Sequence, residues 1–212
     1  MKKFIGFTLA EVLVTLGIIG VVSALTVPSL MNNHQKKVFV TQLHKVYNEF
    51  QQAFAQEISD NYAVDLYEAG LNNSTVYNFM NKHFKGVVSC SYKYDGACLK
   101  NSGSYKNMNG GSFSYTWSNS YALADGAAVA LYLSPSVYST WMGTLTVDVN
   151  GGGKGPNIYG RDLFVMSVYK DGTLKGYPGG STNYSACKSA YSDSSYYYCF
   201  QNILNDGWDM KY

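Results

Sequence analysis

The chain has 212 residues, of which 46% are apolar and 14% are charged, and its formal net charge is +2. This length allows one ordinary domain plus an anchoring segment. Lys2 and Lys3 supply the whole positive excess, and the remaining residues carry 14 basic and 14 acidic side chains. No run of Lys or Arg could follow a phosphate backbone, so the composition argues against a nucleic-acid-binding protein.

The first long segment, residues 7–30, is almost entirely apolar. As an α-helix at 1.5 Å per residue it would be about 36 Å long, enough to span a bilayer. It is also longer than the roughly 7–15 apolar residues of a secretory signal. Lys2 and Lys3 favour a cytoplasmic N-terminus, so everything after residue 30 is expected outside the membrane.

Glu11 is the only charged side chain between Phe4 and Gln35. A carboxylate at the centre of a membrane helix costs about 2.5–3.5 kcal/mol on insertion scales, and such groups usually mark a function. The alternative is an interfacial Glu that reaches the cytoplasmic headgroups. Glu11 is therefore a candidate functional residue.

The stretch KKFIGFTLAEVLVTLGIIG resembles the prepilin-type N-terminus of type IV pilins and type II secretion pseudopilins. A short basic leader, Gly6, Phe7 after it, and Glu11 ahead of an apolar run carry the resemblance. It implies that the prepilin peptidase cuts after Gly6 on the cytoplasmic side and that the same enzyme N-methylates Phe7. It also implies that Pro28 stands where many type IV pilins carry a helix-kinking proline.

The cut after Gly6 would give Glu11 a physical role. It creates a cationic amine at Phe7, four residues before Glu11 on the same helix face. A carboxylate in a dry helix bundle needs a partner, and the amine of a neighbouring subunit supplies the opposite charge. Glu11 is therefore predicted to be an assembly determinant that sets the axial register between subunits.

The resemblance also implies partners and a location. The partners are the prepilin peptidase, other pilin or pseudopilin subunits in a homopolymer, and an inner-membrane assembly platform. Before assembly the chain would be a single-pass protein of the inner membrane with an extracytoplasmic head. After assembly it would belong to a filament at the cell surface or in the periplasm.

Residues 31–60 have the pattern of an amphipathic helix that continues the apolar one. Apolar residues recur at steps of three and four, and we expect this stripe to face a sheet: Phe39, Leu43, Val46, Tyr47, Phe50, Phe54 and Ile58. A second short helix is expected over residues 74–84, with Ser74 or Thr75 as its cap.

The rest of the chain predicts antiparallel strands. The expected runs are residues 112–118, 127–133, 144–149, 163–169 and 173–177, and the pairs Asp125-Gly126 and Asp171-Gly172 predict hairpin turns. The fold class is therefore α+β, with a long N-terminal helix packed on an antiparallel sheet in a pilin-like head. The expected organisation is a cleaved leader (1–6), a transmembrane and assembly helix (7–30), a stalk helix (31–60) and a globular head (61–212).

Four cysteines, Cys90, Cys98, Cys187 and Cys199, lie beyond the apolar segment. None forms C-x-x-C, so zinc-ribbon and thioredoxin-like sites are excluded by spacing. An even number behind a membrane segment fits two disulfides in an oxidising compartment. Three pairings are possible, of which the local one closes short loops, and four buried free thiols are the alternative.

The stretch DVNGGGKGPNIYGRDLF resembles a head loop of many prepilin-type proteins. Major pseudopilins of type II secretion carry calcium in a head loop, so the resemblance implies a possible Ca²⁺ site, although no cofactor is required. Asp148, Asn150, Asn157 and Asp162 offer the oxygen ligands that Ca²⁺ prefers. The alternative is that these side chains shape the connection through Asx turns.

The sequence lacks the pattern of an enzyme. His34, His44 and His83 share no metal or triad spacing, and Ser185-Ala186-Cys187-Lys188 matches S-x-x-K without S-D-N or K-T-G. The prediction is a structural subunit of a type IV pilus or a type II secretion pseudopilus. DNA-uptake pseudopilins share the same N-terminus. The alternative is a membrane-anchored monomeric binding or adhesion domain, or a minor tip pilin.

Overall fold

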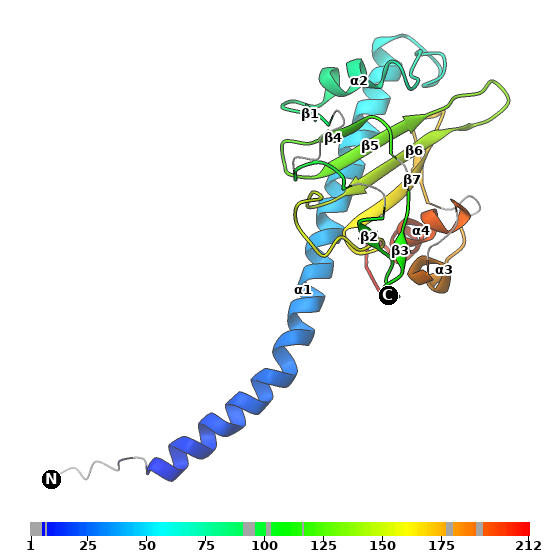
Figure 1. Cartoon of the computed structure of the whole chain (residues 1–212). Helices are drawn as coiled ribbons and strands as arrows, with labels where there is room; N and C mark the ends of the chain where they lie inside the picture. Colours follow the sequence, from blue (N-terminus) through cyan, green and yellow to red (C-terminus); the bar gives the residue numbers. More distant parts are fainter. Residues whose placement is uncertain are drawn as a thin grey trace. The chain divides into compact units, whose positions relative to one another are not determined.

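The computed structural model describes residues 6, 8–90, 96–100, 103–115, 117–176, 180–189 and 193–212. The chain forms two compact units, Met1–Val38 and Phe39–Tyr212. The second unit, here called the head unit, holds the β-structure (Figure 1). Each unit is described by itself below.

Helix α1, Leu9–Asp60, is one continuous helix of 52 residues. In the head unit one stripe of α1 is buried: Phe39, Val40, Leu43, Val46, Phe50, Ala53 and Phe54. These residues recur at steps of one, three and four, so they lie on one face of the helix. Tyr47 and Ile58 are partly buried against the same core. The predicted amphipathic stripe is confirmed.

Helix α2, Val76–His83, packs its buried Phe79 against the end of α1. The rings of Phe79 and Phe54 stack with centroids 5.3 Å apart, and Phe84 lies 4.6 Å from Phe50 by the same measure. Aromatic pairs at this spacing stabilise by about 0.5–1.5 kcal/mol beyond area burial. The predicted second helix is confirmed, and these rings join it to α1.

The start of α2 differs from the expected cap. Thr75 occupies the N-cap position, but its side chain makes no capping hydrogen bond to the helix. Its hydroxyl instead accepts a hydrogen bond from the Asn72 N–H at 2.9 Å and lies 3.1 Å from the Gly70 carbonyl oxygen. Ser74 Oγ donates to Asn72 Oδ1 at 2.6 Å. Both hydroxyls therefore bond to Asn72 and stabilise the turn before α2 instead of capping the helix.

The main sheet has six antiparallel strands in the order β1-β4-β5-β6-β7-β8. Their bounds are Val88–Ser89 (β1), Ser120–Ala122 (β4), Ala128–Leu133 (β5), Trp141–Asp148 (β6), Leu163–Tyr169 (β7) and Leu174–Lys175 (β8). In Figure 1 the strands β5 and β6 pass in front of α1. The predicted α+β class, a long helix with an antiparallel sheet, is confirmed.

Both predicted Asp-Gly turns form hairpins. Asp125 and Gly126 lie between β4 and β5, where the Leu123 N–H donates to the Ala127 carbonyl at 2.8 Å. Asp171 and Gly172 join β7 to β8, and Gly172 has φ +79°. Glycine reaches this left-handed region without steric cost, which explains why the turns are placed there.

The expected strand over residues 112–118 is wrong in its length. Among the described residues of this run, Ser112–Phe113 alone pairs, as β3, with β2 (Tyr105–Lys106) in a separate two-stranded sheet. Beyond Phe113 the aromatic side chains Tyr115 and Trp117 bond to other parts of the head unit instead of lying on a paired strand. Tyr115 Oη donates to Thr144 Oγ1 at 3.1 Å, and Trp117 Nε1 donates to the Lys100 carbonyl at 2.8 Å. Side-chain contacts therefore replace strand pairing here.

The C-terminal part contains helix α3 (Tyr184–Ser189), the short 3₁₀-helix η1 (Asp193–Tyr197) and helix α4 (Tyr198–Asn205). Trp208 follows and stacks on His44 of α1 with centroids 3.9 Å apart. It also meets the Tyr47 ring edge to face at 5.1 Å. Trp208 therefore anchors the C-terminal segment on the α1 face of the head unit.

Candidate assembly site

Helix α1 begins with a reciprocal capping box. Glu11 Oε2 accepts hydrogen bonds from the backbone N–H and the hydroxyl of Thr8, both at 2.8 Å. The Glu11 N–H donates back to Thr8 Oγ1 at 3.3 Å. A Thr and a Glu three residues apart satisfy each other's backbone donors in this way at helix N-termini. The T-L-A-E pattern was visible in the sequence, so this role of Glu11 could have been predicted.

The predicted processing point lies just before this box. Gly6 is exposed and lies outside any helix or strand. Phe7 lies outside the described residues. Thr8 caps the helix and Leu9 is its first residue, so Gly6 precedes α1. Cleavage after Gly6 stays a prediction.

Every residue from 8 to 34 is exposed, including large apolar side chains such as Leu9 (80%) and Leu25 (75%). Two hydroxyls inside this segment bond to the helix itself. Thr15 Oγ1 donates to the Val12 carbonyl at 3.0 Å, and Thr26 Oγ1 donates to the Val22 carbonyl at 2.9 Å. Polar groups satisfied within the helix suit a lipid environment.

Pro28 lies inside α1. Proline has no backbone N–H, so the carbonyl of Ala24 loses its ordinary helical donor at this point. Loss of one bond lowers the local stiffness of a helix, and bends commonly occur at such residues. A bend of α1 is therefore easier at Pro28 than at a residue that keeps its helical hydrogen bond. The role of Pro28 in assembly stays a prediction.

The head loop that follows β6 uses its carboxylates as hydrogen-bond acceptors. Asp162 Oδ1 and Oδ2 accept the N–H groups of Ile158 and Asn157, each at 2.7 Å. Asp148, fully buried, accepts the Tyr105 hydroxyl at 2.6 Å and the Asn150 N–H at 3.3 Å. These contacts are the turn-shaping chemistry weighed above as the alternative to calcium.

Burial raises the pKa of Asp148 to about 7, and the charge of Asp162 adds to this rise against the hydrogen bond from Tyr105. Burial also raises the pKa of Asp162. Asn150 Oδ1 is buried without a hydrogen-bond partner among the described residues. One open oxygen falls short of the roughly six to eight that Ca²⁺ takes, so the arrangement does not fit the ion as it stands. Calcium at Asp148, Asn150 and Asp162 stays a prediction.

The four cysteines form two local disulfides, Cys90–Cys98 and Cys187–Cys199. The first links Cys90, directly after β1, to Cys98, and the second joins α3 to α4. Cys187 and Cys199 are both fully buried, beside Gly160 of the head loop. Free thiols, the alternative considered above, are wrong, because no free cysteine remains.

Residues from α1 and α2 form one cluster that sequence spacing could not reveal. His83 Nε2 lies 2.7 Å from Glu57 Oε2, and Lys82 Nζ lies 2.8 Å from the same oxygen and 2.9 Å from Asp60 Oδ2. Among the described residues, only Glu57, Asp60 and His83 are close enough to hold a metal ion together. Lys82 already pairs with both carboxylates, so the cluster acts as an electrostatic tie between the helices.

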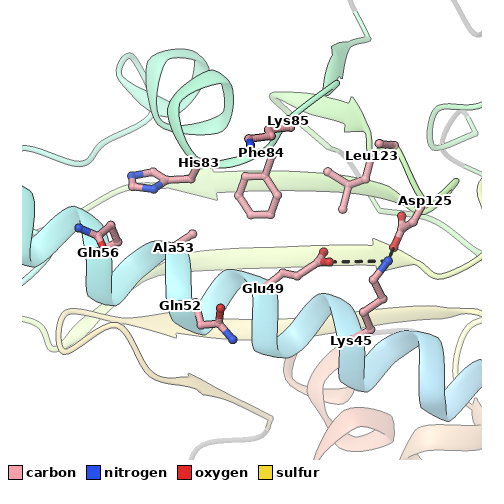
Figure 2. A pocket seen from close by; sticks show the side chains of 11 residues that line it. Lys45, Glu49, Gln52, Ala53, Gln56, His83, Phe84, Lys85, Leu123 and Asp125 are labelled. Carbon is pink, nitrogen blue, oxygen red and sulfur yellow. Dashed lines mark hydrogen bonds and ion pairs between the residues drawn. The ribbon is translucent and has the colours of Figure 1, made fainter.

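A pocket of about 630 Å³ lies between α1, the end of α2 with the residues after it, and the β4–β5 turn. Figure 2 shows the side chains that line it. Lys45 Nζ lies 2.8 Å from Asp125 Oδ2 and 3.7 Å from Glu49 Oε1. The hydrogen bond that Lys45 donates to Asp125 raises the pKa of Lys45. Because these charges pair with one another, they fix α1 to the turn rather than offering a charged ligand site.

Residues 1–27 match the family model of the prokaryotic N-terminal methylation motif. No curated protein and no solved structure matches the chain. Within the described residues, α1 is the one helix long and apolar enough to cross a membrane. The chain therefore carries the prepilin-type cleavage and methylation signal of type IV pilins and pseudopilins, ahead of an α+β, pilin-like arrangement.

Proposed function

We propose that this chain is a structural subunit of a type IV pilus or a type II secretion pseudopilus. It is cut after Gly6, N-methylated at Phe7 and polymerised through the first part of α1. One observation carries the proposal: the methylation motif at residues 1–27 leads into a helix whose residues 8–34 are all exposed. Such an apolar helix needs lipid before assembly and neighbouring subunits after it.

The prepilin signal and the apolar helix fit a protein anchored in the inner membrane. Lys2 and Lys3 favour a cytoplasmic N-terminus, which puts the head unit on the extracytoplasmic side. The two disulfides suit that side, because disulfides persist in oxidising compartments. The partners at this stage are the prepilin peptidase and the inner-membrane assembly platform.

The capping box explains how Glu11 is tolerated before assembly. Its two hydrogen bonds from Thr8 both go to Oε2, and Oε1 accepts none among the described residues. The carboxylate is thus partly satisfied within its own chain and keeps one oxygen open. The Phe7 amine of a neighbouring subunit can bond to Oε1 without breaking the helix start, and the resulting ion pair sets the register.

Helix packing supplies the remaining contact. In a bilayer the apolar side chains are already out of water, so close fit and polar pairs drive helix association more than the hydrophobic effect does. A Cβ added at Gly17 or Gly20 would meet no atom within 4 Å. These two glycines leave shallow places on α1 where a neighbouring helix can approach closely.

The alternative is a membrane-anchored monomeric binding domain, or a minor tip pilin, that uses the same signal without forming a homopolymer. Mass spectrometry of the N-terminus, on sheared surface material and on membranes separately, tests the proposal. A chain that starts at methylated Phe7 in the sheared fraction supports a surface filament. The same terminus in membranes alone supports a short pseudopilus or the anchored alternative. An intact Met1 in both fractions contradicts the proposal.

A further inference from the structure

A second pocket of the head unit, about 680 Å³ in volume, lies where β5 and β6 meet the segment before β4. Thr144 of β6 pairs directly with Tyr132 of β5, so their side chains share one face of the sheet. Tyr115 bonds to Thr144, so the described residues of this segment, Ser114, Tyr115, Trp117 and Ser118, border that same face. The pocket is therefore the part of this face that the segment leaves open.

The lining of this pocket is aromatic and uncharged. Six of its nine residues are aromatic: Tyr115, Trp117, Tyr132, Trp141, Tyr196 and Tyr197. The other three, Ser114, Ser118 and Thr144, carry hydroxyls. The lining therefore offers neither a carboxylate nor a cationic group. A charged ligand would lose its hydration without gaining a counter-charge, so the chemistry selects a neutral one.

Hydrogen bonds and ring contacts hold the aromatic walls in place. Trp117 Nε1 donates to the Lys100 carbonyl at 2.8 Å, and Tyr196 Oη donates to the Ser114 carbonyl at 3.1 Å. The Tyr115 ring lies between them, with centroids 5.5 Å from Trp117 and 5.2 Å from Tyr196. Rings fixed before binding lose little conformational entropy when a ligand arrives.

One polar atom of the lining has no partner in the described part of the chain and is shielded from solvent, so it would have to rotate toward the pocket to meet a ligand. Ser118 Oγ is buried and has no hydrogen-bond partner among the described residues. A buried hydroxyl without a partner is costly, and a ligand hydroxyl is one group that could satisfy it. Tyr132, 42% exposed, stands at the rim with its ring open to solvent.

We propose that this pocket binds a neutral saccharide. A sugar ring has an apolar C–H face that packs on aromatic rings, whose faces carry partial negative charge, and it has hydroxyls around its edge. Trp117, Trp141 and Tyr132 provide the stacking surfaces, and Ser118 receives a sugar hydroxyl. The volume lies within the roughly 300–1,000 Å³ of small-molecule sites. The site lies in the head unit alone, so it requires no filament and is independent of the proposed function.

The test uses the full chain in lauryldimethylamine oxide micelles, because this detergent carries no sugar headgroup. Maltotriose, cellotriose and N,N′-diacetylchitobiose are titrated to about 10 mM, where a site with a Kd of about 1 mM is mostly filled. Tryptophan fluorescence and saturation-transfer NMR follow binding. The charged probe is 3′-sialyllactose. We expect saturable binding of at least one neutral probe and weaker binding of the charged one.

Tyr132→Ala should weaken binding by about three- to tenfold, because one stacking surface is lost. Tyr138→Ala is the matched control, since Tyr138 is 98% exposed and lies outside the pocket lining. Near-ultraviolet circular dichroism checks that both variants keep the native head. The proposal is overturned if no neutral probe binds, if only sialyllactose binds, or if Tyr132→Ala binds as tightly as Tyr138→Ala.

Discussion

Glu11 and Thr8 bond to each other in both directions, with Glu11 Oε2 2.8 Å from the Thr8 nitrogen and from its hydroxyl oxygen. One side chain therefore has two roles that ordinary mutagenesis would confuse. The first role is to cap the start of α1, which the structure shows. The second is the ion pair between subunits, which is proposed. Gln at an N3 position also completes a capping box, so the two roles can be separated.

Glu11→Gln should keep the helix start and lose assembly. The amide oxygen can still accept from Thr8, but it offers no charge to the Phe7 amine. We expect processing to continue and the amount of subunit in sheared filaments to fall at least about tenfold, which corresponds to about 1.4 kcal/mol. Immunoblots of sheared and membrane fractions measure both quantities.

Thr8→Val is the matched control for that substitution. It removes the hydroxyl from the capping box and leaves the carboxylate of Glu11 charged. We expect filaments to form, with a helix start weakened by about 1 kcal/mol. Normal filament yield from Glu11→Gln, or equal loss from both variants, would contradict a role for the charge.

The two disulfides should differ in their contributions to stability. Their sequence separations, 8 and 12 residues, give similar loop entropies of about 2.5–3 kcal/mol. Cys187 and Cys199 are fully buried, whereas Cys90 is partly exposed. Replacing Cys187 and Cys199 by Ala leaves a cavity in the core, which adds about 1–2 kcal/mol. Urea unfolding of the two double variants, followed by tryptophan fluorescence, measures the difference. Equal losses of unfolding free energy in the two double variants would show that the core around residues 187 and 199 repacks and leaves no cavity.

Local patterns predicted much of this fold. The spacing of Phe39, Leu43, Phe50 and Phe54 gave the buried stripe of α1, and the Asp-Gly pairs marked both hairpins. These features depend on residues a few positions apart, where helix and strand periods operate directly. The capping box at Thr8 was equally local, and its T-x-x-E pattern would have allowed a prediction that was not made.

Features that depend on distant partners could not be predicted. Tyr105 meets Asp148 across 43 positions, and Glu57 meets His83 across 26. Nothing in the intervening sequence indicates that the two residues of either pair are in contact. The alternation at 112–118 was misleading for the same reason, because Trp117 bonds to Lys100 instead of joining a ladder. The disulfide pairing stayed open until the structure brought α3 and α4 together.

Gly160→Ala should be much more costly than an ordinary substitution in a loop. Gly160 has φ +83°, and an added Cβ would lie 2.6 Å from Cys199 Sγ and 2.9 Å from the methyl of Met108. The left-handed backbone alone costs about 1–2 kcal/mol for Ala. The clash forces the buried disulfide or the loop to move, which adds about 1–3 kcal/mol. Thermal unfolding in micelles measures the total.

Gly207→Ala provides the comparison for that clash. Gly207 has φ +70°, and an added Cβ would meet no atom within 4 Å. It should therefore show the backbone cost alone. If the two variants melt at the same temperature, the packing of the head loop on Cys199 is looser than these distances indicate.

The cluster of Glu57, His83 and Lys82 should make stability depend on pH. Burial pushes the pKa of Glu57 upward, but the hydrogen bonds from His83 and Lys82 outweigh burial and hold that pKa below its usual value. A group with a lowered folded pKa binds fewer protons in the folded state than in the unfolded one. Its contribution is therefore complete above the unfolded pKa of about 4.5 and is lost as the pH falls through the folded value.

Glu57→Gln removes this contribution and keeps the size of the side chain. Because the cluster is partly solvent-screened, we expect wild type to exceed the variant by about 0.5–1 kcal/mol in unfolding free energy above about pH 5. The difference should shrink as the pH falls below about 4.5 and should vanish once the carboxyl is protonated in the folded state as well. Lys82→Gln should reproduce part of the loss, since Lys82 Nζ lies within 2.9 Å of both Glu57 and Asp60 oxygens. Urea titrations across this pH range measure each curve, and a difference that stays constant with pH would mean that Glu57 acts through packing rather than charge.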